Sequence, residues 1–436
     1  MMRTFSHGIH PDASKGQTQN RPIRRFPFAP YFVVHLSQNA GTPARSIVQA
    51  GQEVRRGQVI ARPDGHVSVP VHAPVTGTVQ LVGSSYDSNG NPAPSIIIRP
   101  NPSSDQAIEV SSPIDPEKLN PAQLIQAIRD MGMVGLGGAA FPTHVKLSPP
   151  KGKSIHTLIF NGAECEPYLT SDHRVMVEQA VNVVMGAKLL LRATGASKAL
   201  LGVENNKPDA IAALEAACMG ISNLQVVAMP TKYPQGAEKM LLKTLLGVEI
   251  PSGGLPADVG VAVSNIATVA EIGHLLPLGM GLLERVVTIT GDGIRNPGNY
   301  LIPIGTPLDF ILKTLGTNGT PYKVIFGGPM MGKTVSFLSS PITKGTSGIV
   351  VLAHHGDPEE LRISPCIRCG KCVEACPMHL VPARLGWMAR KGEYELMATQ
   401  HHLLDCFECG CCSYVCPSNI PLVQQFRISK QMFREK

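Results

Sequence analysis

Cys366-Ile-Arg-Cys-Gly-Lys-Cys-Val-Glu-Ala-Cys-Pro377 and Cys406-Phe-Glu-Cys-Gly-Cys-Cys-Ser-Tyr-Val-Cys-Pro417 are two copies of one cysteine pattern, C-x2-C-x2-C-x3-C-P. The short gaps let one loop reach three corners of a cubane iron-sulfur cluster, while the fourth cysteine points away and ligates the other cluster. The pattern therefore predicts two [4Fe-4S] clusters with crossed ligands. The first cluster is predicted on Cys366, Cys369, Cys372 and Cys416, and the second on Cys376, Cys406, Cys409 and Cys412.

Zinc binding and disulfide formation fit these cysteines less well. A structural zinc site uses two well-separated pairs and needs neither a third cysteine two residues on nor the closing Cys-Pro. Nothing upstream looks like a secretory signal, and eight of the eleven cysteines serve as predicted cluster ligands, which fits a reducing cytoplasm. Only Cys412 keeps both spacings of the pattern, so its neighbour Cys411 is predicted to be a packed free thiol.

The composition indicates a globular protein of several domains. At 436 residues the chain exceeds the size at which one core keeps growing, so about two to four domains are expected. With one Trp and no basic stripe interleaved with aromatic residues, a nucleic-acid platform is excluded. No run of about 20 apolar residues is present, so we expect no transmembrane segment. The net charge of +7 suits an acidic partner or an anionic membrane surface.

Residues 1–112 are predicted to form an irregular, partly ordered arm and then a small β sandwich. From Val48 onward, valines alternate with glycine turns, as is typical of short strands. The segment Ala73-Pro-Val-Thr-Gly-Thr-Val79 resembles the hairpin of biotinyl and lipoyl carrier domains, but Asp64-Gly-His66 stands where carriers present their modified lysine. Without that amine, we expect a carrier-shaped module used for packing or docking.

Residues 113–283 alternate helix and strand signals, which predicts an α/β domain with parallel strands. A Gly-rich run, Gly132-Met-Val-Gly-Leu-Gly-Gly-Ala-Ala-Phe-Pro-Thr143, follows a helix that begins at Pro121. Glycines let a backbone approach a flat ring or a phosphate. A strand from His156 then ends in Asn161-Gly-Ala-Glu-Cys-Glu166, whose acids are placed to accept hydrogen bonds from ribose hydroxyls. Taken alone, the first motif is explained equally well as a tight turn, and the second is explained better as a solvated loop with an acid pair.

The remaining residues are predicted to form a β-grasp module and a helical ferredoxin domain. Residues 284–353 return to strand signals, with one helix near Leu308–Leu315. Residues 354–436 carry both cysteine runs, which are separated by apolar residues at helical spacing. A compact β-type ferredoxin has no place for such helices. The predicted class is therefore multidomain α/β and α+β, with a carrier-like sandwich, a Rossmann-like domain, a β-grasp module and a helical two-cluster domain.

The order of these motifs resembles the C subunit of the Rnf/Rsx ion-translocating electron-transport complex, over nearly the whole chain. The likeness rests on the carrier-like hairpin, the twin cysteine motif, G-L-G-G-A-A-F-P-T-H-V-K from Gly135, N-G-A-E-C-E-P-Y-L-T-S-D-H-R from Asn161, Y-P-Q-G-A-E-K from Tyr233 and P-S-G-G-L-P-A-D-V-G from Pro251. Residues 113–283 are also similar to the flavin-bearing, NADH-oxidising subunit of respiratory complex I, whose G-R-G-G-A-G-F-P-T and E-G-E-P loops bind FMN and NADH.

This second similarity implies an FMN and NADH pocket. The FMN phosphate and ring would be cradled by Gly135, Gly137, Gly138, Ala139, Phe141 and Lys146. Asn161 and Glu164 would contact the flavin, and Glu166 would lie toward the nicotinamide nucleotide. The pocket would be completed by Gly236, Glu238, Asn265 and Thr268. The chain departs from the complex I pattern at Leu136, Ala140, Ala163, Cys165 and Ala237.

The resemblance implies the electron-input subunit of a membrane-bound, ion-translocating oxidoreductase, an NADH-dependent electron-transport translocase. It implies two [4Fe-4S] clusters and FMN as cofactors, NADH as substrate, and the other subunits of the complex and a ferredoxin as partners. The location would be peripheral, on the cytoplasmic face of the inner membrane. Since the flavin carries the chemistry, no catalytic side chain is predicted. Two alternatives stay open: a non-catalytic electron-transfer or scaffold subunit with a degenerate nucleotide site, and a stand-alone soluble NADH dehydrogenase.

Overall fold

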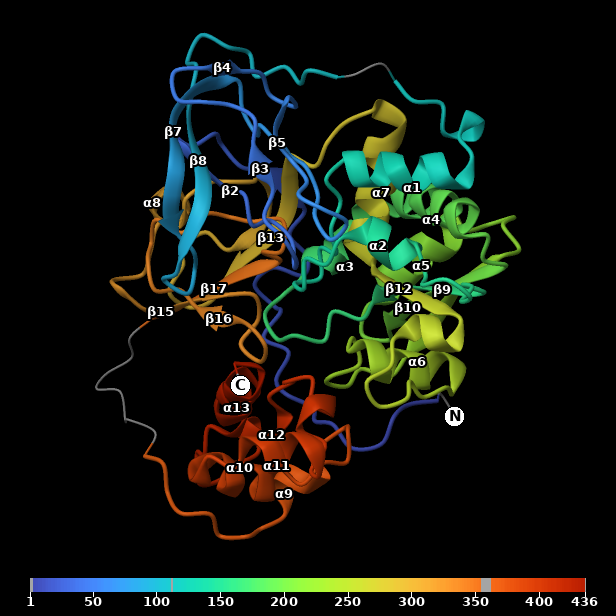
Figure 1. Ribbon diagram of the computed structural model, residues 1–436, viewed down its shortest axis with the longest axis vertical. Helices are drawn as coiled ribbons and strands as arrows, with labels where there is room; N and C mark the ends of the chain where they lie inside the picture. The colour runs from blue at the N-terminus through green and yellow to red at the C-terminus, as the bar shows by residue number, and fades with distance from the viewer. Residues whose placement is uncertain (1–2, 111–112, 354–361, 436) are drawn as a thin grey trace.

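The computed structural model describes residues 3–110, 113–353 and 362–435, and within them it shows four sheets and a group of short helices (Figure 1). The predicted multidomain α/β class is confirmed. The predicted domain joints after residues 112 and 353 adjoin residues outside the described part, so they stay predictions. No helix in the described part combines the length and apolar character needed to cross a bilayer.

The N-terminal sandwich consists of two antiparallel sheets. The larger has the strand order β2, β8, β7, β4, with bounds Phe32–His35, Pro92–Pro100, Gly77–Tyr86 and Glu53–Val54. The smaller joins β3, β5 and β6, at Arg45–Ser46, Val59–Arg62 and Val71–His72. Side chains from both sheets, such as Ile60 and Ile96, share one buried core. Because successive side chains of a strand point to opposite faces, the alternating valines of the sequence supply this core.

The N-terminal arm is irregular as predicted, but it is ordered along its described length. Phe5 and Ile9 are buried, and Ile9 forms an isolated bridge with Tyr233. Further on, β1 (Ile23–Arg25) pairs in parallel with β14 (Gly298–Pro303). The few apolar residues of the arm thus find partners on domains far along the chain.

The α/β domain has a four-stranded parallel sheet in the order β11, β10, β9, β12. The strands span Leu224–Met229, Lys198–Glu204, Thr157–Gly162 and Val261–Asn265. Helices α1 to α7 span Pro121–Asp130, Thr143–Leu147, Ser171–Glu178, Ala180–Thr194, Pro208–Ala217, Glu238–Leu246 and Ile266–Leu278. In β9, Leu158 and Phe160 pack into the core shared with α1, α4 and α7, whereas Ile159 packs against α6 on the other face. The predicted parallel α/β alternation is thus confirmed.

Helices α4 and α7 touch through their backbones. A Cβ added at Gly186 would lie 1.9 Å from a carbonyl oxygen of α7, and one added at Gly273 would lie 2.0 Å from the carbonyl oxygen of Asn182. Asn265 caps α7 at the end of β12. The close crossing therefore fixes the N-terminus of α7 at the carboxyl edge of the parallel sheet.

The module after the α/β domain is a mixed sheet with one helix. Its strands β13 to β17 span Glu284–Thr290, Gly298–Pro303, Pro321–Phe326, Lys333–Thr334 and Gly348–Ala353. Together with β1 they run in the order β1, β14, β13, β17, β15, β16, with β13 and β17 parallel at the centre. Helix α8 (Leu308–Leu315) occupies the predicted residues and packs Ile311 and Leu315 against the sheet.

The cysteine-rich domain contains five short helices and lies beside the α/β domain near α6 (Figure 1). Helices α9 to α13 span Lys371–Glu374, Pro382–Lys391, Tyr394–Thr399, Cys411–Tyr414 and Leu422–Arg434. Leu385, Met397 and Phe426 form its core together with several cysteines. The helical character predicted for the segment between the two cysteine runs is confirmed by α10 and α11.

Candidate functional site

The two cysteine runs fold into the same loop. Left-handed residues occur at equivalent positions of both runs, and their φ angles agree closely. The pairs are Arg368 (56°) with Glu408 (62°), Gly370 (79°) with Gly410 (83°), and His379 (55°) with Asn419 (51°). Left-handed backbone is uncommon outside glycine, so its recurrence at Arg, Glu and His positions marks a shape that both loops require. The repeat in the sequence is therefore also a repeat in the structure.

The first predicted cysteine group lines one cavity. Cys366, Cys369 and Cys372 meet there with Cys416, which comes from the second run. Residues of α10, including Arg390, form part of the wall. Cys416 therefore lies beside the other three cysteines of the first group, and its role as the crossed fourth ligand stays a prediction. Cys366 and Cys369 are exposed to solvent, whereas Cys372 is buried.

The second predicted group is more deeply enclosed. Burial, together with the nearby thiolates of Cys409 and Cys376, raises the pKa of Cys406 to about 11. Burial likewise raises the pKa of Cys412, with Cys406, Cys409 and Cys376 as neighbours. Thiols with raised pKa values become thiolates when a metal supplies positive charge. Four cysteines in one place, three of them with raised pKa values, therefore fit a metal cluster.

The spacing of these side chains does not suit a single metal ion. Across residues 3–110, 113–353 and 362–435, no three Cys, His, Asp or Glu side chains converge as the ligands of one ion would. The ligands of a cubane bind different iron atoms and stand farther apart. All eleven cysteines are free thiols, and Cys411 is fully buried with a hydrogen bond to Cys409. The expectation that Cys411 is a packed free thiol is confirmed.

Single serine substitutions test the ligand assignment. In Cys412→Ser the second cluster loses a ligand, so we expect about half of the iron to be lost after anaerobic reconstitution. Cys411→Ser is the matched control, because it changes the adjacent residue in the same way and should retain the iron. Iron and acid-labile sulfide content measure the outcome. Iron loss in Cys411→Ser with retention in Cys412→Ser would move the ligand by one residue.

The flavin-type candidate residues gather at the carboxyl edge of the parallel sheet. Asn161 is the last residue but one of β9, Asn265 is the last residue of β12, and the two are paired neighbours in the sheet. Asn161 Nδ2 donates to the carbonyl oxygen of Gly236 at 2.8 Å, which brings the later loop to the same edge. Open α/β sheets bind their ligands at this edge.

The Gly-rich loop presents bare backbone above this edge. Residues 137–139 are exposed, and Gly138 has a φ of +111° with open space where a Cβ would stand. The side chain of Asn265 packs against the first of these residues. Thr268 Oγ1 accepts a hydrogen bond from Leu136 N at 2.9 Å, so the loop is held on the N-terminus of α7. The arrangement forms a cradle that a flat ring or a phosphate can approach.

A lysine and a helix N-terminus lie next to this cradle. Lys146 Nζ is 3.4 Å from Glu238 Oε2 and 3.4 Å from the carbonyl oxygen of Val263. Glu238 begins α6, whose N-terminus has no side-chain cap. A cation beside the positive end of a helix suits an anionic group. Gly135 N donates to the carbonyl oxygen of Phe141 at 2.9 Å and closes the base of the Gly-rich loop.

The two acids of the Asn161 loop use their carboxylates within the protein. Glu164 is buried and accepts hydrogen bonds from the backbone of residues 172–173, at the start of α3. Glu166 accepts from the backbone N–H groups of residues 330–331, in the loop after β15, at 3.1 and 2.7 Å. Both acids therefore tie the Asn161 loop to neighbouring segments of the chain. Their contacts with flavin and nucleotide stay predictions.

Two buried cations near the pocket were not predicted from the sequence. Lys15, from the N-terminal arm, donates to the carbonyl oxygen of Glu164 and lies 4.0 Å from its carboxylate. Arg285, in β13, donates to the carbonyl oxygens of Leu136 and Lys344. Neither cation belongs to a motif, and each reaches the pocket from another part of the chain. Only the tertiary fold reveals their positions.

The second cysteine group contacts the α/β domain directly. Tyr233 Oη donates to the carbonyl oxygen of Cys409 at 2.7 Å. Cys165, which accepts a hydrogen bond from Gly236 N at 3.4 Å, belongs with Tyr233 and Cys411 to one apolar cluster. Packed protein thus links the flavin-type loops to the second cysteine group, while the first group faces outward.

Curated relatives resemble the chain along most of its length. It is 42% identical over 406 residues to the C subunit of the proton-translocating ferredoxin:NAD(+) oxidoreductase complex of Clostridium ljungdahlii, covering 93% of this chain and 88% of the relative. It is 42% identical over 400 residues to the C subunit of the Na(+)-translocating complex of Acetobacterium woodii, covering 90% and 88%. The chain belongs to the C-subunit family of these ion-translocating oxidoreductases. The C subunit of the ion-translocating oxidoreductase complex of Pseudomonas aeruginosa is 41% identical over 438 residues, and the chain spans 56% of that longer relative.

Four family descriptions match consecutive parts of this C-subunit family member. The RnfC barrel sandwich hybrid domain matches residues 3–103, and the Nuo51 FMN-binding domain matches residues 128–274. The SLBB domain matches residues 286–334, and the 4Fe-4S dicluster domain matches residues 365–420. The resemblance stated from the sequence is therefore confirmed, together with an FMN-binding type of domain and a dicluster type of domain.

Two solved structures share the fold of this family member. Both are of an NAD+-reducing [NiFe]-hydrogenase. The air-oxidized form has a TM-score of 0.50 at 21% identity and covers 68% of this chain and 60% of that chain. The H2-reduced form has a TM-score of 0.51 at 20% identity and covers 74% and 68%. At this level of identity, the likeness concerns the fold.

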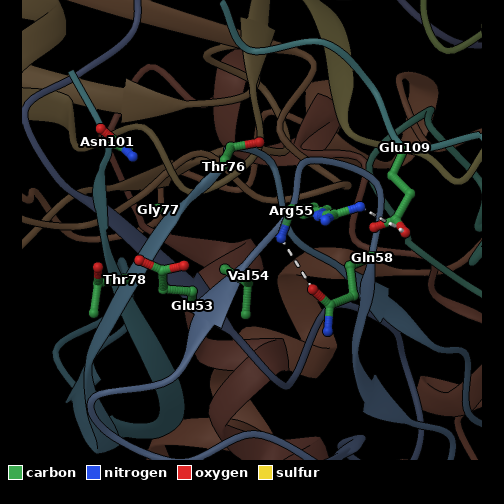
Figure 2. A pocket seen from close by; sticks show the side chains of 9 residues that line it. All are labelled: Glu53, Val54, Arg55, Gln58, Thr76, Gly77, Thr78, Asn101 and Glu109. Carbon is green, nitrogen blue, oxygen red and sulfur yellow. Dashed lines mark hydrogen bonds and ion pairs between the residues drawn. The ribbon is translucent and has the colours of Figure 1, made fainter. Parts of the chain in front are cut away.

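One hollow of the structure lies away from these sites, in the barrel-sandwich domain (Figure 2). It measures about 490 Å³ and lies beside β4 and the start of β7. Two acids, Glu53 and Glu109, and one cation, Arg55, line it, and Arg55 pairs with Glu109 at 3.8 Å. It contains none of the predicted site residues. We therefore assign the function to the sheet edge and the cysteine groups.

Proposed function

We propose that this chain is the electron-input subunit of an ion-translocating ferredoxin:NAD oxidoreductase complex. It would exchange electrons between NADH, at an FMN pocket, and two [4Fe-4S] clusters, and pass them to membrane partner subunits. The observation that carries the proposal is the contact of Tyr233 with Cys409, because it joins the flavin-type loops to the second cysteine group. The names of the relatives support the reaction class. A complex of this kind places the chain peripherally on the cytoplasmic face of the inner membrane.

The residues at the sheet edge fit FMN. The open space over Gly138 accommodates a ring edge or phosphate that a side chain would block. Lys146 and the uncapped N-terminus of α6 supply positive charge for a phosphate. Asn161 and Asn265 supply amide groups at neighbouring strand ends. The groups that would hold FMN are those predicted from the sequence, with Glu164 acting through the backbone of α3.

Bound FMN supplies the conversion between two-electron hydride transfer and one-electron steps, which is the cofactor's own chemistry. The protein supplies position and a water-poor connection. Tyr233 and Cys411 are buried at the junction, so they exclude water between the pocket and the second cysteine group. Glu166 holds the loop of residues 330–331 over this junction through two hydrogen bonds.

The burial of the two cysteine groups suggests their order along the path. The second group contacts the α/β domain through Cys409, whereas Cys366 and Cys369 of the first group are exposed. Electrons exchanged with the pocket would therefore use the second cluster first. The first cluster would face the next carrier. The number of clusters, two, rests on the repeated loop and its eight cysteines.

A scaffold subunit with a degenerate nucleotide site is the second candidate function. One observation favours it: the carboxylates of Glu164 and Glu166 already accept hydrogen bonds from backbone groups. Acids used in this way are less free to bind ribose hydroxyls. A non-catalytic subunit would still relay electrons through its clusters, but it would not bind FMN or oxidise NADH.

Anaerobic titration separates the two functions. After cluster reconstitution and addition of FMN, we expect NADH to bleach the visible absorbance of the flavin. Bleaching of the broad cluster absorbance should follow. Gel filtration before the titration tests whether FMN stays with the protein. Failure of FMN to bind, with no bleaching by NADH, would establish the scaffold function instead.

Lys146→Met refines this test. The change removes a charge beside the cradle, and charge-assisted hydrogen bonds contribute about 1.5–3 kcal/mol, so FMN binding should weaken by roughly 10-fold to 100-fold. Lys153→Met is the matched control, because Lys153 is a partly exposed lysine of the same domain that pairs with Asp258 instead. Quenching of FMN fluorescence measures both affinities. Equal affinity in the two variants would remove Lys146 from the pocket.

A further inference from the structure

Cys411 is the one cysteine of the second run to which the cluster pattern gives no role. It lies between the predicted ligands Cys409 and Cys412 and is fully buried. Its thiol forms a hydrogen bond with the Sγ atom of Cys409. A thiol can donate or accept such a bond. A cysteine that binds iron as a thiolate has no proton to give, so in the cluster-bound protein only Cys411 can be the donor.

Apolar side chains from distant parts of the chain enclose the thiol of Cys411. Ile9 of the N-terminal arm, Tyr233 of the α/β domain and Ala375 of the first cysteine run are buried in the same cluster of side chains. Met330, from the loop after β15, packs against this cluster. A polar group in such surroundings loses free energy if its hydrogen bond is broken, because no water replaces the partner. The enclosure therefore holds the thiol against its partner sulfur.

The first cysteine run has no buried thiol at the equivalent position. The backbones of the two loops match, since Gly370 and Gly410 have φ angles of 79° and 83°. The next residue is Lys371 in the first loop and Cys411 in the second, and these residues begin the four-residue helices α9 and α12. Lys371 is exposed, whereas Cys411 is buried. The buried donor is therefore a feature of the second loop.

We propose that Cys411 donates a hydrogen bond to the ligand sulfur of Cys409 and thereby raises the reduction potential of the second cluster. The inference rests on the proposed function, because it needs a cluster on Cys376, Cys406, Cys409 and Cys412. Reduction adds one electron to this cluster, no bond is made or broken, and Cys411 keeps its proton. Hydrogen bonds to the sulfurs are among the factors that set the potential of a cluster. The donor interacts more favourably with the reduced cluster, which is more negative, so it favours reduction.

The burial of the second cysteine group gives such a donor a purpose. Cys376 and Cys412 are buried, whereas two ligands of the first group are exposed. A buried site takes up negative charge less readily than an exposed one. The second group is also the one that Tyr233 joins to the flavin-type loops. Cys411 would offset the effect of burial and favour electron transfer from the flavin pocket to this cluster. It acts through a ligand, as a positioning residue, and is not a ligand itself.

Three substitutions of Cys411 separate hydrogen bonding from packing. Valine is similar in volume but cannot donate, alanine is smaller and cannot donate, and serine keeps a donor. The full chain is reconstituted with its clusters, titrated anaerobically with dithionite and redox mediators, and followed by electron paramagnetic resonance. In Cys411→Val and Cys411→Ala we expect the reduced-to-oxidised ratio of the second cluster at a fixed potential to fall by at least about threefold. At about 59 mV per tenfold change, this is a decrease of about 28 mV. Cys411→Ser should stay at or above the wild-type potential.

Two other variants assign the signals and control for the substitution. Cys412→Ser should lose the second cluster, so the component that disappears from its titration belongs to that cluster. The component of the first cluster should keep its potential in every Cys411 variant. Cys218→Val is the matched control, because Cys218 is a buried free thiol in the core of the α/β domain. It should leave both components at their wild-type potentials.

Several results would overturn the proposal. Unchanged potentials in Cys411→Val and Cys411→Ala would show that the hydrogen bond has no influence on the cluster. An equal decrease in Cys411→Ser would assign the effect to packing, and so would an equal decrease in the first component or in Cys218→Val. Loss of about half of the iron in Cys411→Val and Cys411→Ala would make Cys411 a ligand instead.

The titration also separates this inference from the proposed NADH reaction. Dithionite and mediators reduce the clusters without NADH or FMN. Shifted potentials in the Cys411 variants, together with a failure of NADH to bleach the flavin, would remove the NADH function and leave the role of Cys411 standing. Flavin bleaching together with unchanged potentials would do the opposite. A wild-type protein that binds no second cluster would overturn the role of Cys411 and the two-cluster path alike.

Discussion

Arg285→Met is expected to lower the free energy of unfolding by about 3–5 kcal/mol, because removing one partner of a buried charge network leaves the others uncompensated. Arg285 is 2% exposed and donates hydrogen bonds to the carbonyl oxygens of Leu136, in the Gly-rich loop, and of Lys344. Methionine fills much of the same volume without replacing these donors. For a domain of about 150–250 residues, each kcal/mol shifts the melting temperature by about 2–4 °C. A decrease of roughly 6–20 °C should therefore be seen by differential scanning fluorimetry.

The loss of stability in Arg285→Met should depend on pH. Burial and the charge of Glu164 together raise the pKa of Asp172 to about 7, and burial raises the pKa of Glu271 to about 7. Arg285 opposes both shifts. For acids with raised pKa values, the stabilising contribution is complete below the unfolded pKa and is lost as the pH rises through the folded pKa. Without Arg285 both carboxyl groups ionise less readily in the folded protein. The free energy of unfolding that Arg285→Met loses relative to wild type should therefore be larger at about pH 8 than at about pH 5.5.

Two control variants locate the cause. Arg285→Lys keeps the positive charge but lacks the planar fork that reaches two carbonyl oxygens, so its loss should be intermediate and less dependent on pH. Arg295→Met changes an exposed arginine in the next loop and should leave the melting temperature close to wild type. A pH-independent loss in Arg285→Met would show that packing, and not charge, makes this residue important.

The structural features that the sequence predicts best are those set by residues close together in the chain. Eight cysteines at fixed spacing define two loops, and the structure reproduces the repeat down to matching left-handed residues such as Arg368 and Glu408. The parallel α/β alternation is equally local, since Leu158 and Phe160 face one core and Ile159 faces the other. Such features depend on spacing and periodicity within one segment. They can therefore be predicted without knowing the tertiary fold.

Long-range supports of the site could not be predicted in this way. Lys15 reaches Glu164 across about a third of the chain, and Arg285 reaches Leu136 from another domain. A buried cation is recognisable only when its surroundings are known, because the same residue in a loop is usually exposed. The hydrogen bonds from the backbone of residues 330–331 to the Glu166 carboxylate likewise could not be predicted from the sequence. These contacts tie separate domains together around the predicted pocket.

Gly186→Leu is expected to have the other large effect, a loss of more than about 3 kcal/mol, because overpacking a tight core costs about 1–3 kcal/mol and occasionally more. Even a single Cβ at this position would lie 1.9 Å from the carbonyl oxygen of Val269, and it meets backbone instead of a movable side chain. The leucine must push α4 away from α7. The higher helix propensity of leucine offsets only about 1 kcal/mol of this cost.

The displacement of α7 should also reach the pocket. Asn265 and Thr268 begin this helix, and they hold Gly137 and Leu136 of the Gly-rich loop. In folded Gly186→Leu protein, or in the milder Gly186→Ala, we therefore expect weaker FMN binding as well as a lower melting temperature. Gly16→Ala is the matched control, since Gly16 has open space around the added methyl group and no positive φ. Wild-type stability in Gly186→Ala would show that α4 and α7 can separate freely. Lost stability with unchanged FMN affinity would show that the crossing supports the fold without setting the geometry of the pocket.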